Sequence, residues 1–444
     1  MKKPRWLILV AAVAGLALVA AACGGDGEGG GGGAAEACAA DEFGCAEYGP
    51  GEPIKLGTLL AISGDTATLG QDSVNGATLA IDNRDGTLDA TGGLVAGREV
   101  EQVNEDDGCS AEGGQAGATK LAADPDIVAV IGTSCSSAAL GVADRILSDQ
   151  GIILISPSNT NPNLTSEGTH QPFYLRTAHN DKIQGAVVAN FAYDELGVTT
   201  AATINDESPY ADALAAVFRQ VFEAKGGTIT TFEQIQSTDT DFKPLLTSIG
   251  EGSPEFLYYP DFNPACGLLA AQAADIPGLA DTTLAGSDGC FAPDYLEVAG
   301  DAANGTFISG PDLTVFQGGD FYKNDFLPAY SDQFGTAPTA SFHAHSFDAA
   351  SILFDAIEAV AIEEGDTLFI PRSALSDALY AVSGYEGITG IITCTPLGDC
   401  ATDVTIGVFE VPGLPVEGGD ENAKPVYSET LTLPEAEALA AGGA

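Results

Sequence analysis

A serine that follows a short apolar run carries the clearest binding chemistry in this sequence. The run Ile127–Ile131 indicates a strand, and Ser136 begins an expected helix, Ser136–Leu147, soon after it. At such a junction the free backbone N–H groups of the helix and the serine hydroxyl face outward at the carboxyl end of the strand, where they form a site for a carboxylate. Serine is also favoured as a plain helix N-cap. The residues alone leave both roles open.

Residues suited to catalysis are few. The chain has four histidines and no G-x-S-x-G, P-loop, H-E-x-x-H or CxxC motif. His343 and His345 alternate as H-x-H, which would offer two metal ligands on a strand, but no third ligand lies nearby in the sequence. We therefore expect a protein that is not an enzyme and that holds no metal and no cofactor.

The charge of the chain restricts its partners. Among 444 residues there are 63 acidic and 16 basic side chains, for a formal net charge of −47. Nucleic acids and anionic membranes are bound through clustered Lys and Arg, so neither is expected as a partner of a basic face. A hydrophobic content of 45% argues against disorder of the whole chain. The acidic side chains are expected to form a solvated surface.

Nine cysteines are an odd number, and the N-terminus suggests a role for one of them. Lys2, Lys3 and Arg5 precede an apolar run, Leu7–Ala22, which is typical of a signal peptide. Small residues stand directly before Cys23, and this junction resembles a bacterial lipobox. The resemblance implies a signal peptide over residues 1–22, lipidation of Cys23, and an extracytoplasmic protein anchored to the cell membrane. An ordinary signal peptide that is cut nearby is the alternative.

Both ends of the remaining chain differ in composition from its middle. Residues 23–53 are expected to be a Gly-rich tether, which after Cys23 begins GGDGEGGGGGAAEA and in which Cys38 and Cys45 close a small loop. Residues 412–444 are rich in Gly, Glu and Ala and are expected to be an acidic tail, partly ordered at best.

Between these ends, apolar runs alternate with amphipathic stretches. The continuously apolar runs IVAVI and IILI are typical of parallel strands covered on both faces. Such alternation predicts an α/β fold with right-handed crossovers. One group of strand–helix units precedes Arg176 and another follows it, which predicts two lobes. The expected strands are Ile54–Ile62, Ile127–Ile131, Ile152–Ile155, Thr199–Ile204 and Phe256–Tyr259, and the expected helices are Asn75–Asn83, Ala111–Ala123, Ser136–Leu147, Ile183–Leu196, Tyr210–Ala224 and Phe242–Ile249.

Nine motifs occur in an order that resembles a known family, the branched-chain amino acid binding proteins of ABC transporters, which have the type I periplasmic-binding-protein fold. The motifs are LLAISGDTATLGQDSVNGATLAIDN, NEDDGCS, VIGTSCSSA, ISPSNTNPNLT, LRTAHNDKIQG, NDESPYAD, DFKPLL, FLYYPDF and AGSDG, between Leu59 and Gly289. The resemblance covers about Ile54 to Val411. It implies two Rossmann-like lobes with parallel-sheet cores, joined by a three-crossover hinge.

The resemblance also implies how the segments divide between the lobes. Residues 54–177 with 312–388 are expected to form lobe 1, and residues 178–311 with 389–411 are expected to form lobe 2. The three crossovers are expected near Arg176–Thr177, Thr306–Gly310 and Thr389–Thr393.

Six residues match ligand-contacting positions of the family. Ser136, Ser158 and Thr160 would come from one lobe and bind the α-carboxylate and ammonium of an amino acid through hydroxyl and backbone groups. Asp288 resembles the family's carboxylate, often Glu, that pairs with the ligand ammonium.

Tyr210 and Phe262 match aromatic pocket positions on the second lobe. Leu69 stands where relatives commonly place an aromatic side chain that covers the ligand. The alternatives to these roles are a turn rich in Ser and Asn, a surface carboxylate, and aromatic core residues.

Disulfides are the third implication of the resemblance. It implies a bond between Cys109 and Cys135, which lie in the loops after two neighbouring strands. Cys266 and Cys290 flank loops of the second lobe and would pair similarly, and Cys394 and Cys400 enclose a turn. Because eight cysteines allow 105 pairings, the set 38–45, 109–135, 266–290 and 394–400 is a prediction.

The function implied is that of a lipid-anchored solute-binding protein of an ABC importer. Such a protein captures a branched-chain or related amino acid by cleft closure and presents it to ABC permease subunits, without nucleic acid or a cofactor. Two alternatives remain at this point: a ligand-binding sensor of the same fold that serves a signalling partner, or a binder of an amide, urea or an aromatic acid.

Overall fold

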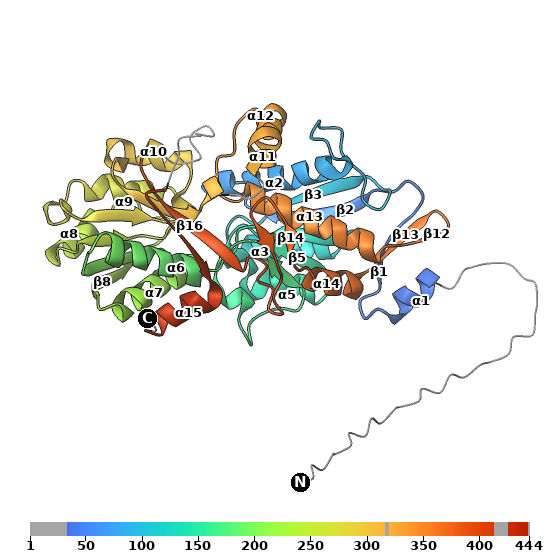
Figure 1. The fold of residues 1–444 in the computed structure, drawn as a ribbon, viewed down its shortest axis with the longest axis horizontal. Helices are drawn as coiled ribbons and strands as arrows, with labels where there is room; N and C mark the ends of the chain where they lie inside the picture. Colours follow the sequence, from blue (N-terminus) through green and yellow to red (C-terminus); the bar gives the residue numbers. More distant parts are fainter. Residues whose placement is uncertain (1–32, 316–318, 413–424, 443–444) are drawn as a thin grey trace, which may run out of the picture.

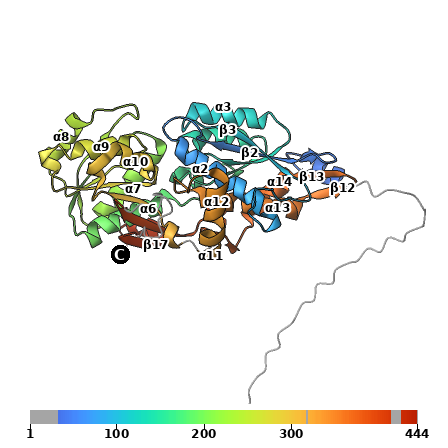
Figure 2. The same cartoon turned by 90° about the horizontal axis from the view of Figure 1, so that it is seen from above.

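Two separate β-sheets organise the chain. The computed structural model describes residues 33–315, 319–412 and 425–442, and these form two α/β lobes that lie end to end along the longest axis of the molecule (Figure 1; Figure 2). Residues 1–22, which are expected to be a signal peptide, and Cys23 lie outside the described residues. Among the described residues, no helix combines the length and the apolar character that crossing a membrane requires.

The first lobe is built on a five-stranded parallel sheet with the order β3-β2-β4-β5-β6. Its strands are β2 (Ile54–Leu60), β3 (Val100–Asp106), β4 (Ile127–Gly132), β5 (Ile153–Ser156) and β6 (Tyr174–Arg176). Every residue of β4 and β5 is buried, as expected for apolar strands with helices on both faces. The helices of this lobe are α2 (Ala67–Asp82), α3 (Ala111–Ala122), α4 (Ser136–Ala138), α5 (Asp144–Ser148), α12 (Leu327–Phe334), α13 (His343–Val360) and α14 (Arg372–Tyr380), and a short helix, α11 (Gly319–Phe321), precedes α12.

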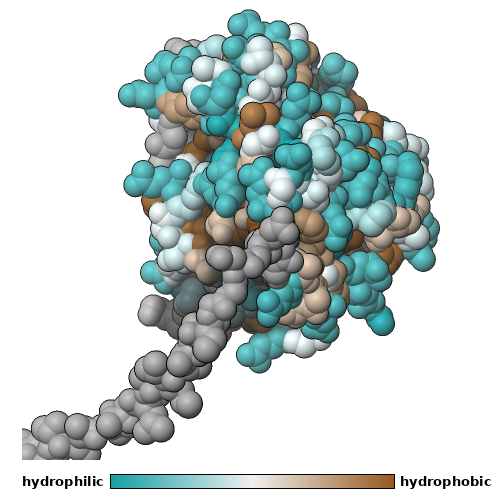
Figure 3. All heavy atoms as spheres, turned by 90° about the vertical axis from the view of Figure 1, so that its right-hand side faces the viewer, coloured by the Kyte–Doolittle hydropathy of each residue, from teal (hydrophilic) through white to brown (hydrophobic). Residues whose placement is uncertain are grey.

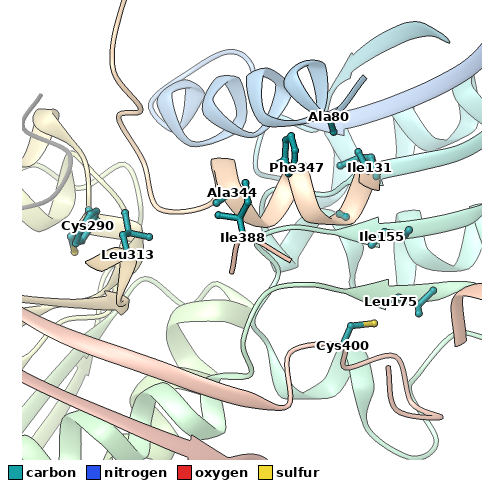
Figure 4. Close-up of a cluster of buried hydrophobic side chains, with 14 of the residues drawn as sticks. Ala80, Ile131, Ile155, Leu175, Cys290, Leu313, Ala344, Phe347, Ile388 and Cys400 are labelled. Atoms are coloured by element: carbon teal, nitrogen blue, oxygen red, sulfur yellow. The ribbon is translucent and has the colours of Figure 1, made fainter. Parts of the chain in front are cut away.

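Helices α2 and α13 pack closely on one side of this sheet. A Cβ atom at Gly76 would lie 2.0 Å from the carbonyl oxygen of His343, so glycine is required for this approach. Figure 4 shows Phe347 of α13 together with Ala80 of α2 and Ile131 of β4, and all three side chains are buried. His343 therefore begins a helix, and the expectation that His343 and His345 lie on a strand is wrong.

The second lobe contains a seven-stranded mixed sheet with the order β17-β16-β11-β10-β9-β7-β8. Strands β7 (Thr200–Asn205), β8 (Thr228–Gln234), β9 (Phe256–Tyr258), β10 (Thr283–Gly286) and β11 (Phe307–Pro311) are parallel, and β16 (Asp403–Glu410) and β17 (Tyr427–Thr432) add to them in antiparallel register. The helices are α6 (Asp181–Asn190), α7 (Pro209–Ala224), α8 (Lys243–Glu251), α9 (Ala265–Ala273) and α10 (Pro293–Ala299). The two sheets confirm the α/β fold class.

In the described chain three segments connect the lobes, and the first follows β6, which ends at Arg176. The second follows β11, because Phe307–Pro311 pairs with β10 and β16 inside the second sheet; the expected crossover at Thr306–Gly310 is wrong. The third follows Cys400. Thr389 is held by Asp348 of α13, and Cys400 donates its N–H to the Arg176 carbonyl, so the chain remains at the first lobe beyond Thr389–Thr393.

Part of the expected tether is folded. Residues 33–40 form α1 (Gly33–Ala40), and β1 (Cys45–Tyr48) pairs with β13 (Thr367–Pro371) in a small sheet that also contains β12 (Ile362–Glu364). Asp41 accepts hydrogen bonds from the backbone N–H and the hydroxyl of Ser373. The disulfide between Cys38 and Cys45, the pairing of β1 with β13 and these hydrogen bonds order a segment whose composition had predicted a flexible tether.

The expected acidic tail is also part of the fold. Strand β17 pairs with β16, and α15 (Leu433–Ala440) begins with a capping box in which Thr432 and Glu435 satisfy each other's backbone N–H groups. Lys182 of α6 forms an ion pair with Glu437 at 2.6 Å. Residues 425–442 therefore belong to the second lobe, and the tail boundary at 412 is wrong for them.

The cysteines of the described chain form the four expected disulfides: Cys38–Cys45, Cys109–Cys135, Cys266–Cys290 and Cys394–Cys400. The last pair lies beside a small two-stranded sheet of β14 (Tyr385–Glu386) and β15 (Ile391–Ile392). The outer end of the first lobe, which Figure 3 shows, is mostly hydrophilic with scattered apolar residues.

Candidate functional site

All six candidate residues follow the carboxyl ends of parallel strands. In the first lobe, Ser136 follows β4, and Ser158 and Thr160 follow β5. In the second lobe, Tyr210 follows β7, and Phe262 and Asp288 follow β9 and β10. Ligands of open α/β sheets bind at this edge. Each lobe therefore contributes one set of candidate residues.

The three candidate hydroxyl groups of the first lobe differ in their hydrogen bonds. Ser136 is 2% exposed, and its Oγ accepts a weak hydrogen bond of 3.3 Å from the backbone N–H of Asn161. Ser158 donates its hydroxyl to the carbonyl of Ser134 at 2.9 Å. The hydroxyl of Thr160 is fully buried and makes no hydrogen bond of ordinary geometry to another described residue, but it lies close enough to Asp181 to act to lower the pKa of that carboxyl. Thr160 of the first lobe therefore lies beside a carboxyl group of the second.

The helix expected at Ser136 is interrupted. Helix α4 contains only Ser136–Ala138, and its N-cap is Cys135, without a side-chain capping bond. Leu140 and Gly141 have non-helical backbone angles, and regular helix resumes at Asp144. Ser136 is therefore not the N-cap, and the plain capping role that the sequence left open does not apply.

In the second lobe, Asp288 lies at the centre of a buried polar network. Oδ1 of Asp288 accepts hydrogen bonds from the Tyr210 hydroxyl and from Nε2 of Gln184, both at 2.8 Å. The Tyr210 hydroxyl also contacts Oγ of Ser287 at 2.6 Å, and its ring centroid lies 5.1 Å from that of Phe262. Burial and the charge of Asp288 raise the pKa of Tyr210 well above its usual value, so the phenol stays neutral and donates.

Two contributors to the site were missed by the sequence analysis. Gln184 lies on α6, just beyond the first crossover, inside the motif LRTAHNDKIQG that carried part of the resemblance. Asn161 donates its backbone N–H toward Ser136 and its side-chain amide to the carbonyl of Pro209, which adjoins Tyr210. Asn161 therefore joins the loops of the two lobes. In the sequence, only its place in the motif ISPSNTNPNLT indicated that it could belong to the site.

An arginine holds the Thr160 loop in place. Arg176 is fully buried, and its Nε donates to Oδ1 of Asp399 at 2.7 Å. Its other nitrogens donate to the carbonyls of Asn159 and Asn161 and to the hydroxyl of Thr165. Arg176 thus contacts the carbonyls on both sides of Thr160 and pairs with Asp399, and its charge also acts to lower the pKa of Asp181, against the larger effect of burial.

Two buried carboxyl groups of the second lobe, Asp181 and Asp261, form no ion pair with another described residue. Asp181, at the start of α6, is fully buried, and burial followed by the charge of Asp288 raises its pKa well above the usual value. The pKa of Asp261, which follows β9, is also raised well above its usual value, first by burial and then by the charge of Asp206. Burial therefore favours the protonated forms of both carboxyl groups, and a cation or an ammonium group that approached them would favour ionisation.

Two cavities lie between the lobes. A pocket of about 20 Å³ adjoins Asp288 and is also lined by Leu69 and Phe262. Outside it lies a cavity of about 530 Å³ between the loop at Ser63–Thr66 and the segment 206–208. The inner pocket has room for about one water molecule, so an amino acid reaches Asp288 only if the lobes separate. No cluster of three metal-ligating side chains occurs in the described part of the chain.

The fold and this interlobe site are those of a bacterial solute-binding protein. The family model described as "Periplasmic binding protein" matches residues 53–406, and the chain belongs to this family. Its members are extracytoplasmic solute-binding proteins and not enzymes.

Relatives of known function and solved structures support this family assignment. The chain is 29% identical over 308 residues (69% of this chain, 79% of the relative) to the Leu/Ile/Val-binding protein BraC3 of Rhizobium johnstonii. It is 32% identical to the leucine-specific-binding protein of Salmonella typhimurium, over 59% of this chain and 68% of the relative.

Among solved structures, the fold matches the leucine-binding protein LivK of Thermotoga maritima with a TM-score of 0.72 at 23% identity, over 86% of this chain and 99% of that chain. It matches the Streptococcus pneumoniae protein LivJ in complex with isoleucine with a TM-score of 0.70 at 23% identity, over the same shares. A solute-binding protein of R. palustris in complex with benzoate matches with a TM-score of 0.69 at 20% identity, over 86% of this chain and 96% of that chain.

Proposed function

We propose that this protein captures a branched-chain or related amino acid between its lobes and presents it to the permease subunits of an ABC importer. The relatives named for leucine, isoleucine and valine support the ligand class. The observation that carries the proposal is that a buried carboxylate, Asp288, on one lobe and a buried hydroxyl, Thr160, on the other both lie close enough to Asp181 to shift its pKa. An α-amino acid offers an ammonium for the first and a carboxylate for the second.

In this proposal each lobe recognises a different part of the ligand. Ser136 and Thr160 donate hydroxyl protons to the α-carboxylate, and the backbone at Ser158 adds further hydrogen bonds. Asp288 pairs with the α-ammonium in a buried setting, where an unpaired charge would be costly. Tyr210 positions Asp288, and Phe262 contacts the ligand side chain.

Binding energy would close the cleft. One ligand can contact the binding residues of both lobes only when the cleft is closed, so the ligand stabilises the closed form relative to the open form. The crossovers at Arg176, after β11 and after Cys400 would act as the hinge. We further propose that acyl chains on Cys23 hold the protein at the outer face of the cell membrane, where it meets the permease.

The experiment is isothermal titration calorimetry of the purified protein with a panel of amino acids, together with an amide, urea and benzoate. We expect saturable one-to-one binding of at least one α-amino acid and its loss in Asp288→Ala, with an unchanged circular dichroism spectrum. A matched control is Asp281→Ala, an exposed carboxylate outside the cleft. Binding of benzoate or urea alone, or undiminished amino acid binding by Asp288→Ala, would contradict the proposal.

A further inference from the structure

Gln184 presents the two ends of its side-chain amide to different partners. Its Nε2 donates to Oδ1 of Asp288 at 2.8 Å and to the backbone carbonyl of Ser309 at 3.3 Å. Ser309 lies on β11, the strand that precedes the second crossover. Because a backbone carbonyl can only accept a hydrogen bond, this end of the amide must be the nitrogen. Oε1 of Gln184 therefore points away from Asp288 and needs a donor of its own.

His179 is that donor. Its Nε2 lies 2.6 Å from Oε1 of Gln184, and the residue is only 1% exposed. Burial lowers the pKa of His179, so the ring is neutral near pH 7 and carries a single ring proton. Since Oε1 of Gln184 can only accept, that proton must be on Nε2. Nδ1 of His179 makes no hydrogen bond to another described residue, so the bond to Gln184 is the polar contact that the described chain gives this ring.

The ring of His179 takes its position from the first lobe. It stacks on the ring of Phe342, with 6.1 Å between the centroids and an interplanar angle of 19°. Phe342 is buried and is the N-cap residue of α13. The crossover that carries His179 is fixed to the same helix, because Thr177 donates its hydroxyl to the carbonyl of His345 at 2.8 Å. A chain of contacts thus leads from α13 of the first lobe, through His179, to the amide that holds the carboxylate of the second lobe.

We infer that His179 is a positioning residue of the binding site, which fixes the orientation of the Gln184 amide and, through it, of the Asp288 carboxylate that receives the ligand ammonium. Its packing against α13 couples this orientation to the position of the first lobe. Without a donor at residue 179, the amide can turn its oxygen toward Asp288, where it would repel the carboxylate instead of holding it.

The inference rests on the proposed function, because it concerns how Asp288 is held for an α-ammonium group. Two substitutions distinguish the hydrogen bond of His179 from the packing of its ring. His179→Phe keeps an aromatic ring against Phe342 and removes the donor, so we expect affinity for leucine, isoleucine and valine to fall about tenfold in titration calorimetry, which corresponds to about 1.4 kcal/mol. His179→Gln loses the ring but can place an amide nitrogen near the position of Nε2, so we expect affinity within about threefold of the parent protein. Equal affinities, or the opposite order, would show a packing role and overturn the inference.

A double-mutant cycle tests whether Gln184 transmits the effect. Gln184→Met has no amide, so in that background we expect His179→Phe to change affinity by less than about twofold. A full loss of about tenfold in that background would overturn the inference. The matched control is His170→Phe, because His170 contacts Tyr174 and Tyr380 within the first lobe, and it should leave affinity within about twofold of the parent protein. A loss in the control equal to that in His179→Phe would overturn the inference as well.

The ligand-free protein gives an independent readout. We expect the side-chain nitrogen NMR signals of His179, assigned by their absence in His179→Gln, to show the ring proton on Nε2 at about pH 7. A proton on Nδ1 would leave two acceptors facing each other at Gln184, and it would overturn the inference while leaving the proposed function intact. Failure of the parent protein to bind leucine, isoleucine and valine would overturn the inference together with the branched-chain ligand of the proposed function.

Discussion

The Tyr210 hydroxyl donates a 2.8 Å hydrogen bond to Oδ1 of Asp288, although 78 residues separate the two along the chain. The bond joins the first turn of α7 to the loop after β10 and leaves the carboxylate oriented by two donors, Tyr210 and Gln184. The side chain proposed to bind the ligand ammonium is therefore positioned before any ligand arrives.

Tyr210→Phe tests this positioning. The variant removes one donor to Asp288 and leaves the ring in place, so we expect amino acid affinity to fall about three- to tenfold and the free energy of unfolding to fall by about 1 kcal/mol. Titration calorimetry and urea denaturation measure the two effects. Tyr330→Phe removes a hydroxyl that donates to Asp72 in the first lobe and serves as the control. Equal losses of affinity in both variants would contradict the role of Tyr210.

Asp399→Asn tests the ion pair at the hinge. Arg176 is fully buried, and Asp399 is its carboxylate partner. Removing that charge leaves the guanidinium buried and unpaired, so we expect the free energy of unfolding to fall by about 3–5 kcal/mol. Because Arg176 also holds the loop that carries Thr160, ligand affinity should fall as well. Asp403→Asn, an exposed carboxylate at the start of β16, should change neither quantity.

Asp107 makes the stability depend on pH near neutrality. Burial raises the pKa of this carboxyl to about 7, against the N–H groups of Cys109 and Ser134 that act to lower it. Between the unfolded value of about 3.9 and pH 7, the folded state keeps a proton that the unfolded state has released. The contribution of Asp107 is therefore complete below about pH 4 and is lost as the pH rises to 7.

The measurement is urea denaturation of the parent protein and of Asp107→Asn at pH 4, 5.5 and 7. We expect the unfolding free energy of the parent to fall with rising pH relative to that of the variant, by about 1–4 kcal/mol in total. Parallel curves would show that Asp107 does not titrate in this range.

Thr432→Ala tests whether the C-terminal segment stabilises the second lobe. The variant removes the capping box of α15, so we expect a loss of about 1 kcal/mol in the free energy of unfolding. Thr336→Ala, at an exposed loop threonine, is the control. An unchanged stability of Thr432→Ala would show that α15 does not contribute to the cooperative fold.

The local sequence pattern was sufficient to predict the central strands of the first lobe. The apolar runs IVAVI and IILI became β4 and β5, and the position of each candidate residue after a strand followed from the order of strands and loops. Pattern was insufficient at the ends. Neither residues 33–48 nor residues 425–442 contain an apolar run like IVAVI or IILI, and both segments are ordered by pairing with β13 and β16, which lie elsewhere in the chain.

The sequence by itself determined the α/β alternation, the cysteine set and the residue types that stand at the strand ends, because these depend on neighbours within a few positions. Only the tertiary structure decided that Gln184 reaches Asp288 across 104 residues and that Asn161 joins the loops of both lobes. Such contacts depend on how two sheets and three crossovers meet in space, and no local periodicity records that arrangement.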